Sequence, residues 1–185
     1  MALAVLNYPT FSDDDFDWIQ SVRQEHDRLY YDVVDPHVSL VFPLDGVKPS
    51  TLIEHVREQA RSSAPFKAPF KVVFRCAILG DPDFEDHAHA FLVPDEGFSD
   101  IVRLHDRLYT GPLADFLRLD LPFLPHVGIA NTPQPEECRE IVDELNAENF
   151  EIRGRVEGLD VVEYEGNSVQ TIEHVPITGA SGEEA

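Results

Sequence analysis

Two histidines occupy matched positions at the start of two short apolar runs. Residues 36–42 read PHVSLVF and residues 125–131 read PHVGIAN, so each histidine lies between a proline and a valine. Both runs have the composition of β-strands. Side chains alternate along a strand, so each histidine faces the same way as the residue two positions later. That residue is Ser39 after His37 and Gly128 after His126.

This combination of side chains suits the cleavage of a phosphodiester. A neutral imidazole can take a proton from an attacking hydroxyl or water, and a protonated imidazole can give one to the leaving oxygen. Histidine serves both purposes because its unperturbed pKa is about 6.5. The Ser39 hydroxyl can donate to a nonbridging phosphate oxygen as negative charge builds there. We therefore expect His37 and His126 to be catalytic, without a metal or other cofactor.

The elements that must position these residues are predicted by capping and periodicity. Helices are expected after Ser12, from a capping box at Thr51 to Glu54, over Phe98–Leu108, and after Pro133 and Pro135. Strands are expected at Leu3–Leu6, Val38–Phe42, Phe70–Leu79, Ala88–Val93 and Val127–Ala130, with a terminal hairpin of Val156–Tyr164 and Val169–Ile177.

The order of these elements is repeated, and so is one pentapeptide. HDRLY occurs at 26–30 and again at 105–109, each time at the end of an expected helix and before a Pro-His-Val segment. A chance match is the alternative, but the matched placement favours internal duplication. The second copy carries an insertion around 111–121. We predict an α+β fold of two pseudo-symmetric lobes, each an antiparallel sheet flanked by helices, with the two histidines facing a central cleft.

The two histidine motifs resemble the His-x-Ser/Thr-apolar signature of the 2H phosphoesterase superfamily, which includes 2'-5' RNA ligase-like proteins and cyclic phosphodiesterases. The resemblance covers nearly the whole chain and implies one bilobal domain over residues 1–178. It implies that His37 acts as the acid, His126 as the base and Ser39 as a phosphate ligand. The reaction that it implies is opening or hydrolysis of a 2',3'-cyclic phosphate on a nucleotide or RNA end, with reverse 2'-5' ligation as a second direction.

Gly128 departs from this signature, because the family has Ser or Thr at that position. One phosphate-binding hydroxyl is therefore missing, and a backbone N–H, a water, Asn131 or Thr132 could replace it. Without a replacement the loss of one donor costs roughly 10²-fold in rate. A noncatalytic nucleotide or RNA-end binding protein is therefore the alternative function, and a different metal-free hydrolase with a coincidental histidine pair is a third.

Other candidate residues have simpler explanations. His87 and His89 resemble a metal-binding run, but they lack a further ligand and are expected to face solvent or lie in a hairpin. His26 and His105 belong to helix ends, as do Arg28 and Arg107, although an arginine there could also reach phosphate. The aromatic residues Tyr30, Phe42 and Phe123 could stack on a base, but core positions are expected for them.

The composition limits which binding partners and which cellular environment the chain fits. The chain has 35 acidic and 14 basic residues, which give a formal net charge of -21. Such a surface is unlike that of a nonspecific nucleic-acid binder, which carries a basic patch. It fits either a salt-accumulating organism or an acidic mesophile protein. The two cysteines and the lack of a long apolar run favour a cytoplasmic protein without a membrane span. We expect a monomer with a tail at 179–185.

Overall fold

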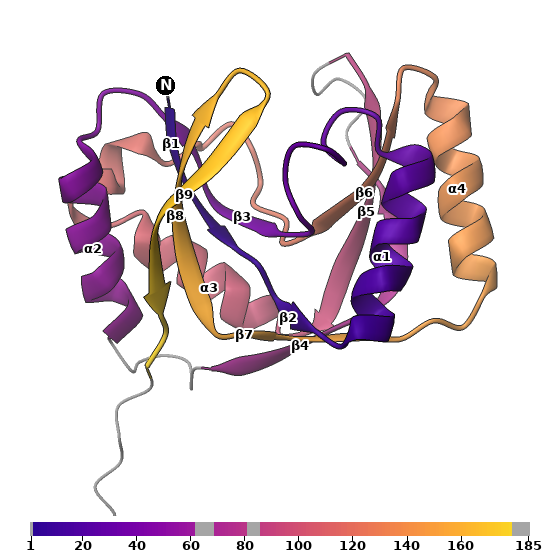
Figure 1. Cartoon of the computed structure of the whole chain (residues 1–185), viewed down its shortest axis with the longest axis horizontal. Helices are drawn as coiled ribbons and strands as arrows, with labels where there is room; N and C mark the ends of the chain where they lie inside the picture. Colours follow the sequence, from indigo (N-terminus) through magenta and orange to yellow (C-terminus); the bar gives the residue numbers. More distant parts are fainter. Residues whose placement is uncertain (1, 62–68, 81–85, 179–185) are drawn as a thin grey trace, which may run out of the picture.

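The computed structural model describes residues 2–61, 69–80 and 86–178, and these form two lobes side by side (Figure 1). One lobe contains helices α2 and α3 and the other contains α1 and α4 (Figure 1). The helices are α1 (Asp13–His26), α2 (Pro49–Arg61), α3 (Phe98–Leu108) and α4 (Pro135–Ala147), with a 3-10 helix, η1 (Gly111–Phe116). Within the described part of the chain, no helix is long and apolar enough to cross a membrane.

Each lobe is built on its own antiparallel sheet. Sheet A has the order β3-β1-β8-β9, and sheet B has the order β2-β7-β4-β5-β6. The strands of sheet A are β1 (Ala2–Asn7), β3 (Val38–Leu44), β8 (Gly158–Glu165) and β9 (Ser168–Pro176). Those of sheet B are β2 (Thr10–Phe11), β4 (Phe70–Leu79), β5 (Ala88–Glu96), β6 (Val127–Thr132) and β7 (Ile152–Val156). The α+β class and the two-lobed antiparallel arrangement predicted from sequence are thus found.

The lobes are not consecutive halves of the chain, because the two repeats exchange elements. Strand β4 follows β3 and α2 in sequence but joins sheet B, and β8 returns from the second half to pair with β1 in sheet A. Helix α1 packs against β6, and α3 packs against β3. The first helix of each repeat therefore supports the histidine strand of the other repeat.

Local sequence explains where the elements begin, and it also explains the errors. Ser12 caps α1 as predicted, since its hydroxyl accepts from the Asp15 N–H at 3.2 Å. Helix α2 begins two residues before Thr51, at Pro49, so the predicted capping box at Thr51 lies inside the helix. Proline favours the first helical position, because it lacks only an N–H that has no partner there.

The predicted strand 156–164 was wrong as one element. Val156 ends β7 in sheet B, and β8 begins at Gly158 in sheet A, so the chain passes from one sheet to the other at Glu157. Strands β2 and β7 were not predicted, because β2 has only two residues and the middle buried position of β7 is Gly154, which has no side chain to mark the apolar face. The predicted insertion contains η1, and the predicted tail 179–185 lies outside the described residues.

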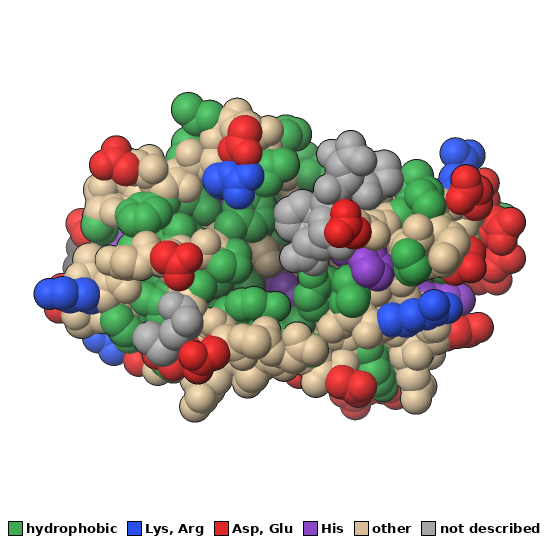
Figure 2. Space-filling model, turned by 90° about the horizontal axis from the view of Figure 1, so that it is seen from above, with side chains coloured by type: hydrophobic (Ala, Val, Ile, Leu, Met, Phe, Trp, Pro, Cys, Tyr) green, Lys and Arg blue, Asp and Glu red, His purple; other side chains and the backbone are tan. Residues whose placement is uncertain are grey.

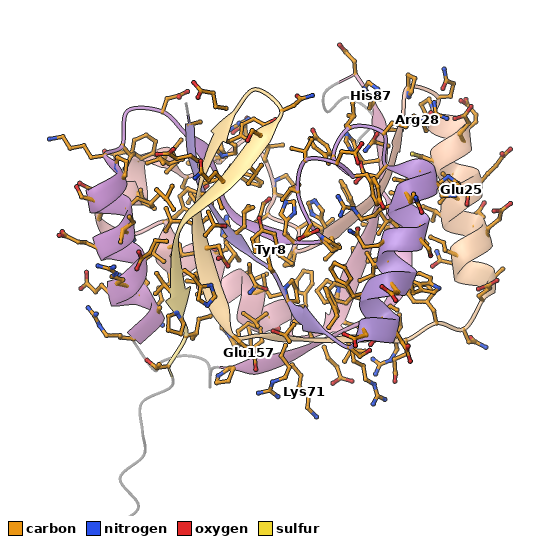
Figure 3. All side chains as sticks on the ribbon, in the orientation of Figure 1. Tyr8, Glu25, Arg28, Lys71, His87 and Glu157 are labelled. Carbon is orange, nitrogen blue, oxygen red and sulfur yellow. The ribbon has the colours of Figure 1, made fainter. Side chains whose placement is uncertain are left out.

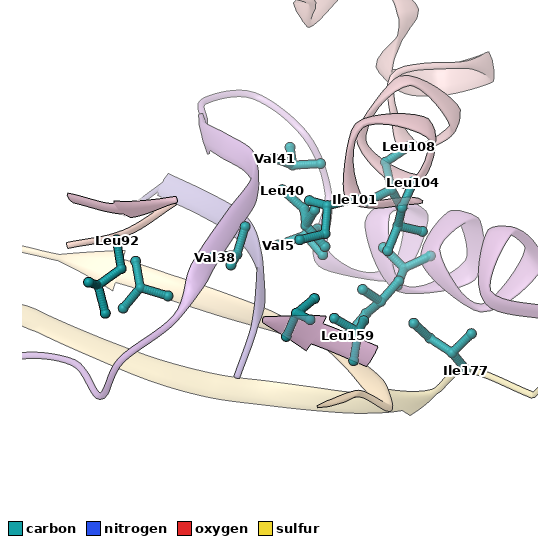
Figure 4. Packing of buried hydrophobic residues seen from close by; sticks show 14 of the residues in the cluster. Val5, Val38, Leu40, Val41, Leu92, Ile101, Leu104, Leu108, Leu159 and Ile177 are labelled. Atoms are coloured by element: carbon teal, nitrogen blue, oxygen red, sulfur yellow. The ribbon is translucent and has the colours of Figure 1, made fainter. Parts of the chain in front are cut away.

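A continuous apolar core joins the two lobes. It lies between the sheets and their helices, and Figure 4 shows part of it where β1 and β3 meet α3. Val38 and Leu40 of β3 contribute to this core, and each is only 1% exposed. A smaller apolar cluster of Ala4, Leu6 and Val162 lies apart from it. Since Leu6 pairs with Ser39 across β1 and β3, their side chains lie on one face of sheet A.

Candidate functional site

The two predicted histidines are oriented by the same kind of hydrogen bond, from ring Nδ1 to a backbone carbonyl oxygen. His37 Nδ1 lies 2.8 Å from the Asp35 carbonyl oxygen, and His126 Nδ1 lies 2.7 Å from the Leu124 carbonyl oxygen. A carbonyl oxygen can only accept, so each Nδ1 must carry the hydrogen. In the neutral ring, Nε2 is therefore the basic nitrogen, and in the cation it carries the transferable proton. Both imidazoles thus present the same atom for proton transfer.

Burial alternates along both histidine segments as predicted. His37 and Ser39 are half-buried, whereas Val38 between them is 1% exposed. His126 and Gly128 are half-buried, and Val127 is fully buried. Strands β3 and β6 are the edge strands of their sheets. Figure 2 shows a recess where the two lobes meet, with a histidine side chain (purple) at its bottom and hydrophobic side chains around it.

The pKa values of both imidazoles are lowered by burial. Burial, with the positive charges of His37 and His89 acting in the same direction, lowers the pKa of His126 to about 4. Burial also lowers the pKa of His37, with Arg23 acting in the same direction and Asp27 and Asp35 opposing it. At neutral pH both rings of the free protein are therefore neutral. His37 and His126 are near enough for the charge of one to affect the other, as expected for a common site.

The ring of Phe91 covers one face of His126. The two ring centroids are 3.9 Å apart with an interplanar angle of 27°, and His89 also stacks on Phe91, with ring centroids 5.7 Å apart. Phe91 pairs with Gly128 across β5 and β6. A Cβ built on Gly128 has no atom within 4 Å, so open space takes the place of a side chain there. His89 is buried in β5, which pairs antiparallel with β4, so of the two expected settings it has the hairpin and not the solvent-facing one.

Tyr8 lies beside His37 on the other side of the site. Their ring centroids are 6.0 Å apart, and Figure 3 shows Tyr8 between the two lobes. Burial, with Asp160 and Asp35 nearby, raises the pKa of the Tyr8 phenol to about 12, so the hydroxyl keeps its proton. Sequence reasoning missed both Tyr8 and Phe91, because neither belongs to a repeated motif. The position of Phe91 opposite Gly128 depends on strand register.

The side chains proposed to replace the missing hydroxyl are occupied elsewhere. Asn131 is buried, and its amide oxygen accepts from the backbone N–H groups of Arg28 and Leu29, both at 3.1 Å. The Thr132 hydroxyl is hydrogen-bonded to Gln134 and Glu137 at the start of α4. The suggestion that Asn131 or Thr132 substitutes at Gly128 is therefore wrong for this structure.

The aromatic rings that contact the two histidines are those of Tyr8 and Phe91, and Phe123, for which a core position was expected, packs against the core. Phe123 stacks on His105, with ring centroids 3.7 Å apart. His105 lies in the last turn of α3, as predicted, and burial lowers its pKa. His26 ends α1, also as predicted. Figure 3 shows Arg28 and His87 at the upper end of the second lobe.

In the part of the chain that the structure describes, we looked for metal-binding clusters and for cavities away from the two histidines. No group of three or more His, Cys, Asp or Glu side chains that could hold a metal is found in residues 2–61, 69–80 and 86–178. A cavity of about 560 Å³ lies on sheet B near Lys71, Arg75 and Arg153. Figure 3 shows Lys71 at the lower edge of the molecule, away from Tyr8. A smaller cavity of about 270 Å³ lies between α1 and α4.

Comparisons with known proteins agree with this architecture. The structure is similar to the crystal structure of TT0787 of Thermus thermophilus, with a TM-score of 0.62 and 17% identity over 97% of this chain and 100% of that one. It is also similar to Usb1 of Kluyveromyces marxianus, with a TM-score of 0.51 and 13% identity over 95% and 97% of the two chains. Both likenesses concern the fold.

The sequence itself identifies the family. Comparison with curated proteins gives no significant match. The family model of the 2'-5' RNA ligase superfamily, however, matches residues 11–168, which include both histidine motifs and both copies of the pentapeptide. The chain therefore belongs to the 2'-5' RNA ligase superfamily, within the 2H phosphoesterases.

Proposed function

We propose that this protein is a phosphodiesterase that opens a 2',3'-cyclic phosphate on a nucleotide or RNA end by acid–base catalysis at His37 and His126. Membership of the superfamily supports phosphoester chemistry in general. The observation that carries the proposal is the matched pair of Nδ1–carbonyl hydrogen bonds, at 2.8 and 2.7 Å. They leave both Nε2 atoms for proton transfer at one phosphorus atom. Residues 1–178 would act as one catalytic unit, and we expect it to work as a monomer.

The proposed reaction needs one proton acceptor and one proton donor. Nε2 of one imidazole takes a proton from water while the oxygen of that water bonds to phosphorus. The bond from phosphorus to one ribose oxygen breaks, and Nε2–H of the other imidazole protonates that leaving oxygen. The product is a phosphomonoester. If the 5'-hydroxyl of a second RNA end replaces water as the nucleophile and the 3' oxygen is the leaving group, the same steps make a 2'-5' linkage and a free 3'-hydroxyl.

The surroundings of the two rings favour His126 as the base and His37 as the acid. The backbone hydrogen bond at Asp35 and the carboxylates of Asp27 and Asp35 stabilise the His37 cation, against the opposing charge of Arg23. The charged groups that act on His126 are His37 and His89, which disfavour its cation. An anionic phosphate between the rings would add further stabilisation to the protonated form of His37. The Ser39 hydroxyl, on the same face as His37, would donate to a nonbridging oxygen.

The test is hydrolysis of a panel of 2',3'-cyclic nucleotides by the wild-type protein and by His37→Asn and His126→Asn variants. Each substitution should lower kcat by about 10²–10⁴-fold, the usual contribution of a positioned acid or base. The double variant should be little worse than either single variant, since the two rings act as a unit. His26→Asn is the control at a partly exposed helix end and should keep full activity. Full activity in either catalytic variant would contradict the mechanism.

Gly128 favours one alternative function. Because it supplies no hydroxyl beside His126, the fold could bind a nucleotide or RNA end without turning it over. Assays at low and high salt separate the two, since a chain of net charge -21 repels an anionic substrate less when salt screens it. Binding of cyclic nucleotides with no product at either salt concentration would favour the binding protein.

A further inference from the structure

A buried polar network begins on the strand that follows His126. Asn131 of β6 donates its amide hydrogen to the Asp27 carboxylate, and its amide oxygen holds the backbone of Arg28 and Leu29. The other Asp27 oxygen accepts from Arg23 Nε at 3.0 Å. Arg23, Asp27 and Asn131 are 2%, 5% and 2% exposed, so the network is shielded from water.

The same network continues into the segment that carries His37. Arg23 Nη2 donates to the carbonyl oxygen of Tyr30 at 3.1 Å and to that of Val34 at 2.7 Å. Val34 immediately precedes Asp35, whose carbonyl oxygen accepts from His37 Nδ1. One chain of hydrogen bonds therefore leads from β6, next to His126, to the backbone that orients His37.

We propose that Arg23, Asp27 and Asn131 are positioning residues that fix the orientation of His37 relative to the His126 strand. The inference rests on the proposed function, because it assigns a task to groups that touch neither substrate nor reacting atoms. Each member is hydrogen-bonded to another member or to backbone, and Arg23 Nη1 also donates to the Gln20 side chain at 2.8 Å. A fully satisfied buried network specifies one arrangement, whereas a partly satisfied one does not.

Electrostatics supports this link between the network and His37. The Arg23 charge lowers the pKa of His37, and the Asp27 charge raises it. Other groups near this ring are Asp35 on its own loop, Tyr8 from the segment after β1, and His126. Removing one member of the Arg23–Asp27 pair should therefore shift the His37 pKa in a direction that depends on the member removed.

The duplicated pentapeptide provides a matched control. Asp106 is the counterpart of Asp27 in the second copy, but its side chain is 68% exposed and contacts His105. Asp106→Asn makes the same chemical change outside the network. It should leave kcat, KM and the His37 titration unchanged.

The experiment follows the His37 imidazole by NMR titration in the full chain and measures kcat and KM with 2',3'-cyclic nucleotides. Asp27→Asn should lower the His37 pKa and reduce kcat by about 10²-fold, with little change in KM, because a small misplacement of a reacting group has that effect. Arg23→Gln should raise the His37 pKa and also reduce kcat. Arg23→Lys keeps the positive charge but loses the forked N–H donors of the guanidinium. It should therefore reduce kcat with a smaller shift of the His37 pKa.

The titration needs no turnover, so the two proposals can fail separately. A wild-type protein without activity on cyclic nucleotides, but with opposite His37 shifts in Asp27→Asn and Arg23→Gln, would overturn the proposed function and retain the network. Unchanged His37 titration and kcat in folded Asp27→Asn and Arg23→Lys would overturn the network. Asn131→Ser, which removes the link to β6 without removing a charge, tests the same point if Asp27→Asn does not fold.

Discussion

The two histidine strands share a backbone geometry but differ in the groups around each ring. His37 lies near the charges of Arg23, Asp27 and Asp35 and is followed by Ser39. His126 lies against the ring of Phe91 and is followed by Gly128, beside open space. The two motifs therefore share the hydrogen bond from Nδ1 to a backbone carbonyl oxygen and differ in the surrounding chemistry. One half of the site is charged and hydroxyl-bearing, and the other is aromatic.

The two pentapeptide copies show the same divergence at equivalent points. Each copy contacts the edge strand of the other repeat five residues after the histidine of that strand. In the first copy, Asp27 and the backbone that follows it contact the Asn131 side chain on β6. In the second copy, the Tyr109 hydroxyl accepts from the Phe42 N–H on β3 at 3.0 Å. Both copies thus cover the outer edge of a histidine strand, where backbone N–H and C=O groups would otherwise be unpaired.

The largest expected change in kcat that tests this comparison comes from substituting the residue two positions after each histidine. Ser39→Ala should lower kcat by roughly 10²-fold, the usual cost of one donor to a developing oxyanion. Gly128→Ser should raise kcat, because the open space beside it accepts a side chain and a hydroxyl there can donate to the phosphate. Steady-state assays on a cyclic nucleotide measure both. A Gly128→Ser variant with lower kcat would mean that this space is needed by the substrate.

A pH profile tests whether the charged half supplies the acid. Burial places the pKa of His37 below 6.5, so its protonated form is already the minor form at neutral pH and falls further as the pH rises. We expect kcat/KM to fall by about tenfold per pH unit above that pKa, since it reports the free enzyme. On the acidic side it should fall as His126 gains a proton near its pKa of about 4. A flat profile between pH 6 and 8 would contradict the assignment.

The smallest expected effect concerns the second pentapeptide copy. Tyr109→Phe removes the acceptor of the Phe42 N–H and should cost about 1–2 kcal/mol in the free energy of unfolding, the usual penalty for a buried donor without a partner. It should leave the His37 titration unchanged, because Tyr109 is outside the Arg23 network. Urea unfolding measures the first quantity. An unchanged free energy of unfolding, or a shifted His37 titration, would remove the distinction between the two copies.

Sequence alone predicted the two lobes and the histidine strands because they depend on local signals. Proline before histidine, alternation of apolar residues and the repeated HDRLY segment are all readable in the chain. The roles of Asn131 and Phe91 depend on register between strands that are distant in sequence, which no local pattern reports. The exchange of helices between repeats was missed for the same reason. Identical pentapeptides gave no sign that Asp27 is buried and Asp106 is exposed.

The most direct test of the two-histidine site is a crystal structure with inorganic phosphate bound. A single phosphate should lie about 3 Å from Nε2 of both His37 and His126, accepting from a protonated ring and donating its own hydroxyl to a neutral one, with the Ser39 hydroxyl on a third oxygen. Phosphate held by only one imidazole, or bound at the Lys71 side of sheet B with the recess unoccupied, would contradict a shared site.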